Sequence, residues 1–145
     1  MGYDGEILNV CPAGLDFSTV YAVVVSGALL NPCGHALLFV PSTDAISSDD
    51  GYYFQVAQAY GLPRYMKTAG YARYLSSNGK TELTRYAVTI PRPSDSYMKL
   101  VSLMGKKWVW GVLPNNCAAF VEDVVRAGGS SAGLYSNCPS RERFE

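Results

Sequence analysis

VYAVVVS (residues 20–26) and GHALLFV (residues 34–40) are the two apolar runs that decide the fold of this chain. The first run is rich in β-branched valine, and the second is continuously apolar after its histidine. The Gly27–Gly34 connection leads from one run directly into the other. We therefore predict two adjacent strands of a buried sheet, with His35 emerging at the start of the second strand.

The remaining pattern predicts an α+β fold, an antiparallel sheet with packed helices, in one domain. The chain has 145 residues, with 48% hydrophobic and 17% charged side chains, which suits a single compact core. Short or regular strands are expected over residues 6–10, 52–60 and 81–90. For residues 52–60, the beginning of a helix is the alternative. Ser94 is the predicted N-cap of a helix whose apolar face comprises Tyr97, Leu100, Val101 and Met104. Residues 61–79 receive no regular element.

The stretch PNNCAAFVEDVVRAGG (residues 114–129) predicts a helix with a cysteine in its first turn. Asn116 is a suitable N-cap, apolar residues recur at helical spacing, and Gly128 with Gly129 ends the helix. Unpaired backbone N–H groups and the positive end of the helix dipole favour the thiolate form of such a cysteine. Cys117 is therefore the candidate nucleophile. A small buried core cysteine is the alternative interpretation.

His35 is the only histidine in the chain, and a thiol nucleophile needs a base beside it. An ordinary core or surface histidine is the alternative. Counting back through the loop after the His35 strand places residues near 57–59 opposite His35. Gln58 is therefore the predicted partner that orients the imidazole, with Gln55 the alternative if the loop contains a bulge. Both glutamines could instead face water.

Two asparagines and two tryptophans are candidates for the surroundings of the thiol. The backbone N–H of Cys117, together with Asn115 or Asn116, would stabilise an oxyanion. Trp110, or equally Trp108, lies between the last two predicted helices and would line the approach to the thiol. A core position is the alternative for each tryptophan.

The motifs at His35 and Cys117 together resemble the papain-like superfamily, specifically the NlpC-type cysteine peptidases and amidases. The GHALLFV segment is similar to the "His then apolar strand" of that group, and NCAAF (residues 116–120) to its "Asn-Cys-x-x-Phe" helix start. The order of His before Cys resembles the circularly permuted branch, which includes the lecithin:retinol acyltransferase-like proteins. The third residue is often a second histidine in this group, whereas here Gln58 or Gln55 would serve.

The resemblance implies a thiol hydrolase that cleaves an amide bond, most readily in peptidoglycan, without metal or organic cofactor. A secreted antibacterial effector or a lysis enzyme would fit, and an immunity-type protein inhibitor is then an expected partner. Acyl transfer or thioester hydrolysis on a lipid group is the second reading. A binding module in which Cys117 and His35 are core residues is the third.

The charge balance and the length of the apolar runs indicate which partners and which cellular locations to expect. Twelve basic residues balance twelve acidic ones, which predicts no nucleic-acid footprint. The N-terminus lacks a basic signal-peptide region, and the apolar run over residues 20–30 is too short to span a bilayer. We therefore expect no stable membrane insertion. The protein would either be secreted without a signal peptide and act in the periplasm or cell envelope, or remain in the cytoplasm.

The four cysteines are too sparse to be a disulfide framework. If Cys117 is the free nucleophile, one pair among Cys11, Cys33 and Cys138 could form a disulfide in an oxidising compartment. A metal site of these three cysteines with His35 lacks any CxxC pair, so we predict no metal.

Overall fold

The computed structural model describes residues 2–9, 12–27, 33–43, 50–56, 60–106, 108–109, 116–133, 139 and 143–145. For Tyr60, Trp108, Val109, Asn116 and Cys117 only the backbone is described. The strands are β1 (Glu6–Ile7), β2 (Thr19–Val25), β3 (His35–Pro41), β4 (Gly51–Gln55), β5 (Tyr60–Gly61), β6 (Arg64–Lys67), β7 (Glu82–Thr89) and β8 (Trp108–Val109). The helices are α1 (Thr68–Ser77), α2 (Pro93–Met104) and α3 (Asn116–Ala127).

The described strands form a six-stranded antiparallel sheet in the order β1-β6-β4-β3-β2-β7, and β5 pairs separately with β8. The predicted adjacent strands are confirmed: β2 pairs with β3 in a register that joins Tyr21 to Phe39 and Val25 to His35. The antiparallel α+β class is also confirmed. The expected strand over residues 52–60 is shorter than predicted, because β4 ends at Gln55 and β5 begins at Tyr60.

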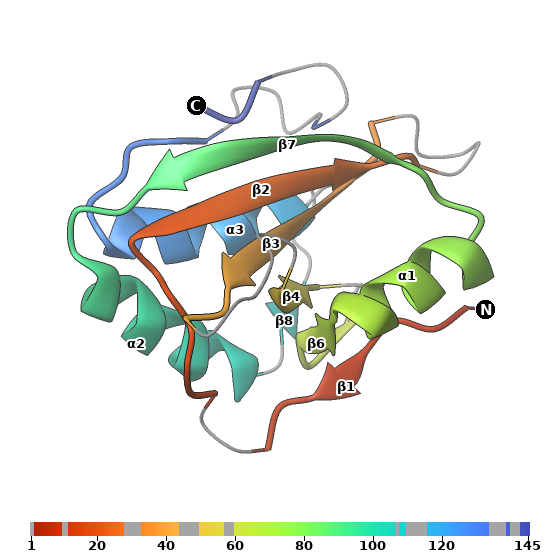
Figure 1. Ribbon diagram of the computed structural model, residues 1–145, viewed down its shortest axis with the longest axis horizontal. Coiled ribbons are helices and arrows are strands. Elements are labelled where there is room, and N and C mark those ends of the chain that lie inside the picture. The colour runs from red at the N-terminus through yellow and green to blue at the C-terminus, as the bar shows by residue number, and fades with distance from the viewer. Residues whose placement is uncertain are drawn as a thin grey trace.

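The two faces of the sheet are covered by different helices (Figure 1). α2 and α3 pack on the face that carries Ala22, Leu38 and Phe54, which we call the α3 face. α1 packs on the opposite face, the α1 face, where Tyr71 and Tyr74 join a second buried cluster. Side chains alternate along each strand, so neighbouring residues of β2, β3 and β4 serve different clusters. The described residues of the sheet are therefore buried on both sides at its centre.

α3 ends before Gly128 as the sequence predicted, but it begins at Asn116 itself, one residue earlier than an N-cap at Asn116 would place it. Its buried residues Phe120, Val121, Val124 and Val125 pack against the α3 face. Gly129 has a φ of 99°, which L residues rarely adopt, so a glycine is favoured where the chain leaves the helix.

The prediction that Ser94 caps α2 is wrong. The helix begins at Pro93 with Arg92 as N-cap, because proline fixes the φ that the first helical turn needs and has no N–H to leave unpaired. Leu100 and Met104 are buried as expected, whereas Tyr97 and Val101 are only half-buried. The helix also buries Ser96, whose Oγ donates a hydrogen bond of 2.7 Å to the carbonyl oxygen of Val124 in α3.

α1 is the element that the sequence pattern did not reveal. Its apolar stripe is interrupted by Gly70, a residue that weakens helices. The glycine has a packing reason: a Cβ there would lie 3.2 Å from the Cβ of Met66 and 3.4 Å from the hydroxyl of Tyr3. Close approach of the N-terminal segment and β6 therefore accounts for the glycine in this helix.

Candidate functional site

His35 is the first residue of β3 and is buried, with 9% of its surface exposed. It follows Gly34, whose φ of 78° turns the chain into the strand. Its partner across the β2–β3 ladder is Val25, which belongs to the α1-face cluster with Leu37. Alternation along β3 therefore places the imidazole on the α1 face.

Gln55 is the residue that the structure brings to His35. The Nε2 atom of His35 and the Oε1 atom of Gln55 lie 2.7 Å apart, and Gln55 has only 1% of its surface exposed. The β3–β4 register pairs Leu38 with Phe54, and its continuation places Gln55 opposite Leu37. His35 is thus the diagonal neighbour of Gln55 on the same face, a contact that long side chains can make without a bulge. Gln58, the first choice from the sequence, lies outside the described residues.

The second hydrogen bond of Gln55 determines which way its amide points. Its Nε2 donates to the carbonyl oxygen of Asp4 over 3.0 Å. A carbonyl oxygen only accepts, so the amide nitrogen must face Asp4 and the amide oxygen must face the imidazole. The neutral His35 ring then carries its proton on Nε2 and its lone pair on Nδ1.

Burial lowers the pKa of His35 to about 4. The hydrogen bond to Gln55 acts in the opposite direction, because it stabilises the protonated ring, and the positive charge of Lys80 lowers the pKa further. The imidazole is therefore neutral near pH 7. In that state it can accept a proton but does not supply a resident positive charge for a thiolate.

Cys117 is the second residue of α3 and so lies in the first turn, as the sequence predicted. Its side chain lies outside the described part of the chain. α3 covers the α3 face through Phe120 and Val124, whereas His35 lies on the α1 face. In Figure 1, β3 and α3 both begin toward the right of the view, at the same end of the sheet. A thiol at the helix start would therefore have to meet the imidazole around this end.

The predicted oxyanion and approach residues are not placed. Asn115 and Trp110 lie outside the described residues. Asn116 is the first residue of α3, and only its backbone is described. Trp108 belongs to β8, which pairs with Gly61 of β5, and its side chain is not described either.

Cys33 is disulfide-bonded. The side chains of Cys11, Cys117 and Cys138, one of which must be its partner within a single chain, lie outside the described residues. A disulfide-bonded sulfur is not a metal ligand, so the Cys33–His35 metal alternative loses a member. Within the described ranges, no group of three or more His, Cys, Asp or Glu side chains could hold a metal ion. No helix in the described part of the chain is both long and apolar enough to cross a bilayer.

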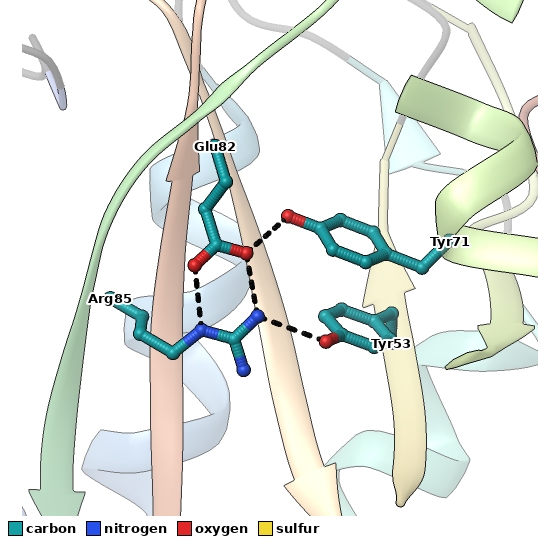
Figure 2. Close-up of polar contacts among 4 residues, drawn as sticks. All are labelled: Tyr53, Tyr71, Glu82 and Arg85. Atoms are coloured by element: carbon teal, nitrogen blue, oxygen red, sulfur yellow. Dashed lines mark hydrogen bonds and ion pairs between the residues drawn. The ribbon is translucent and has the colours of Figure 1, made fainter. Parts of the chain in front are cut away.

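Sequence reasoning missed a polar network on the α1 face, which joins β7, β4 and α1 (Figure 2). Glu82 accepts hydrogen bonds from Nε and Nη2 of Arg85 over 2.8 and 2.6 Å, and Tyr71 donates to the same carboxylate over 2.6 Å. Arg85 Nη2 also donates to the Tyr53 hydroxyl over 3.0 Å. The rings of Tyr53 and Tyr71 stack with centroids 3.9 Å apart. The network thus connects α1 to the far edge strand β7.

The charges within this network are mutually compensated. Hydrogen bonds from Arg85 lower the pKa of Glu82, and the Glu82 carboxylate raises the pKa of Arg85. Burial, and then the hydrogen bond to Glu82, raises the pKa of Tyr71. Tyr71 is therefore a hydrogen-bond donor to an ionised Glu82 near pH 7. The i, i+3 spacing of Glu82 and Arg85 was the one sequence signal, although such spacing on a strand does not place both residues on one face. A bulge in the β2–β7 ladder between Val24 and Val25 brings them there.

Comparison of the chain with protein-family models, curated proteins and solved structures found no match.

Proposed function

We propose that this protein is a cysteine hydrolase that cleaves an amide bond, with Cys117 as nucleophile and His35 as general base. The observation that carries the proposal is the hydrogen bond between His35 Nε2 and Gln55 Oε1. A base must present a lone pair in a fixed direction, and an amide oxygen on Nε2 leaves that lone pair on Nδ1. The position of Cys117 in the first turn of α3 is the second support.

In the proposed reaction, His35 takes the proton from the thiol and returns it to the leaving group. The sulfur of Cys117 forms a bond to the acyl carbon while Nδ1 of His35 takes the thiol proton. The same proton passes to the leaving amine as the C–N bond breaks, and water then hydrolyses the thioester and restores the thiol. Backbone N–H groups at the start of α3, with Asn115 or Asn116, would hold the oxyanion. Because the pKa of His35 is about 4, we expect proton transfer during attack, not a resting thiolate–imidazolium pair.

The substrate we propose is a peptide amide of peptidoglycan. It rests on the resemblance of the GHALLFV and NCAAF segments to the permuted NlpC-type group. An antibacterial effector that reaches the cell envelope, with an immunity-type inhibitor as partner, is the corresponding biological setting.

A non-catalytic binding module is the second candidate, and a specific observation favours it. His35 is buried on the α1 face, and the described residues of α3 pack on the other face. In this reading His35 and Gln55 are a satisfied polar pair of the core. A surface hollow of about 660 Å³ beside Tyr52 and Lys67, between the start of β4 and α1, is a place where such a module could hold a ligand.

Iodoacetamide labelling of Cys117 as a function of pH separates the two candidates. We expect faster labelling in the native chain than in His35→Ala, with the labelled residue identified by mass spectrometry. His35 would accelerate labelling by accepting the thiol proton. Gln55→Leu should show an intermediate rate, and Ser76→Ala, on the exposed side of α1, should match the native chain. Identical slow profiles in the native chain and in His35→Ala would leave only the binding module.

Disulfide mapping is an independent test, because the proposal requires Cys33 to pair with Cys11 or Cys138. A Cys33–Cys117 peptide in the unreduced digest would overturn the proposed nucleophile. With a His35-dependent thiol established, release of amines from peptidoglycan fragments by the native chain, but not by Cys117→Ser, would support the substrate. Acyl transfer to a lipid without amide cleavage would identify the alternative substrate class.

A further inference from the structure

The N-terminal strap, which we define as Gly2–Gly5, is bound to the end of α1 through its main chain. The Tyr3 N–H donates to Ser77 Oγ over 2.9 Å, and Asn78 Nδ2 donates to the Tyr3 carbonyl oxygen over 2.9 Å. The guanidinium of Arg73 lies 4.3 Å from the centre of the Tyr3 ring. The two hydrogen bonds join residues 74 and 75 positions apart in the sequence, so they hold the strap in one place on the folded protein.

Glycines make the path of the strap feasible. Gly5 is buried and has a φ of 103°, and a Cβ there would lie 2.7 Å from the carbonyl oxygen of Tyr65. Gly70 leaves room for the Tyr3 ring on the surface of α1. Immediately after the strap, β1 pairs with β6 through Glu6 and Tyr65. The strap is therefore fixed at both of its ends.

Asp4, in the middle of the strap, contacts the candidate base through one intermediate residue. Its carbonyl oxygen accepts from Gln55 Nε2 over 3.0 Å, and Gln55 Oε1 accepts from His35 Nε2 over 2.7 Å. We propose that the N-terminal strap is a positioning element for His35: the Asp4 carbonyl holds the Gln55 amide in the one orientation that keeps the ring proton on Nε2. Displacing the strap would therefore change the tautomer of His35, although no strap residue contacts the imidazole in this chain of hydrogen bonds.

The physical reason is the two-fold ambiguity of a primary amide. A glutamine can rotate its amide so that either the oxygen or the nitrogen faces a neighbour. With the nitrogen toward His35, the ring would accept at Nε2 and carry its proton on Nδ1, so that the lone pair would no longer be at Nδ1. An acceptor-only carbonyl on the far side of the amide removes this second state. The relevance of this lock to catalysis rests on the proposed function, but the lock itself does not.

A single histidine makes the lock directly measurable. In protein labelled with ¹⁵N at histidine, the shifts of Nδ1 and Nε2 report the tautomer, and the ring N–H reports exchange with water. We expect the native chain to show one tautomer with the proton on Nε2 and a slowly exchanging ring N–H. The test variant is the double substitution Ser77→Ala with Asn78→Ala, which removes both hydrogen bonds to Tyr3.

The matched control is Ser76→Ala, because the Ser76 hydroxyl donates its hydrogen bond to the Arg73 carbonyl oxygen within α1 and not to the strap. We expect the double variant to show averaged ring nitrogen shifts and ring N–H exchange faster on the order of tenfold, the size expected for release of one hydrogen bond. The control should match the native chain. Protected amides in β2 and β3 would show that the sheet remains folded.

Gly5→Ala displaces the strap by a different route, since the added Cβ meets Tyr65 backbone. It keeps the proposal testable if the double variant does not fold. Retention of the Nε2 proton and of its slow exchange in either folded variant would overturn the proposed lock. Cys117 labelling is measured separately. A change of tautomer in the variants with an unchanged labelling rate would support the positioning role of the strap and argue against the catalytic role of His35.

Discussion

Among the residues that the structure describes, the α3 face of the sheet is almost wholly apolar, whereas the α1 face combines apolar side chains with two polar groups. On the α3 face, Phe54, Phe120 and Leu100 lie in one continuous cluster with two helices over it. On the α1 face, one ten-residue helix covers part of the sheet, and the remainder holds the His35–Gln55 pair and the Glu82–Arg85 network. The difference indicates that the α3 face supplies most of the stability, while the α1 face supplies the polar chemistry.

The largest expected effect is the loss of core packing on the α3 face. Phe120→Ala removes a side chain with no exposed surface and should lower the free energy of unfolding by about 3–5 kcal/mol. Leu75→Ala, at a half-buried position on α1, should cost only about 1–2 kcal/mol. Urea unfolding measures both values. Equal losses would contradict the difference between the two faces.

The next effect is a pH dependence that belongs to the α1 face. The pKa of His35 is lowered from 6.5 to about 4 in the folded protein, so below pH 6.5 the unfolded chain takes up a proton that the folded chain refuses. Stability should therefore fall as the pH drops from 6.5 toward 4, by up to about 3 kcal/mol. His35→Gln, which does not titrate, should lack this component. A constant difference in stability between the two proteins across that range would show that His35 titrates normally.

A smaller effect is expected from the network that joins α1 to β7. Tyr71→Phe removes the hydrogen bond to Glu82 and should cost about 1 kcal/mol. Glu82→Gln should cost a similar amount, because the side chains of Glu82 and Arg85 are 29% and 27% exposed and water screens the pair. A double-mutant cycle measures the coupling between Tyr71 and Glu82. Additive losses would mean that the hydroxyl and the carboxylate do not interact in solution.

The smallest effect is expected for an exposed ion pair that belongs to neither face. The Arg92 and Asp95 side chains are 61% and 54% exposed, so Asp95→Asn should change stability by less than about 0.5 kcal/mol. Thermal unfolding in low and high salt provides the comparison. A loss larger than that for Glu82→Gln would reverse the expected order of the two ion pairs.

The elements that the sequence predicted well are those with strong local patterns. The continuous apolar runs of β2 and β3 and the helical spacing of α3 leave few alternatives. α1 escaped prediction because Gly70 and a run of tyrosine and arginine side chains hide its period. The start of α2 was displaced because proline at the first helical position competes with Ser94 as the start signal.

For the candidate site, the sequence by itself indicated that His35 begins a buried strand and that Cys117 lies in the first turn of a helix. It also predicted a glutamine, Gln58 or alternatively Gln55, as the partner of the imidazole. Only the tertiary structure decided that this glutamine is Gln55, that Asp4 orients its amide, and that His35 shares its face with α1. The reason is that alternation fixes which residues of one strand share a face, whereas the path of the chain decides which helix and which terminal segment cover that face.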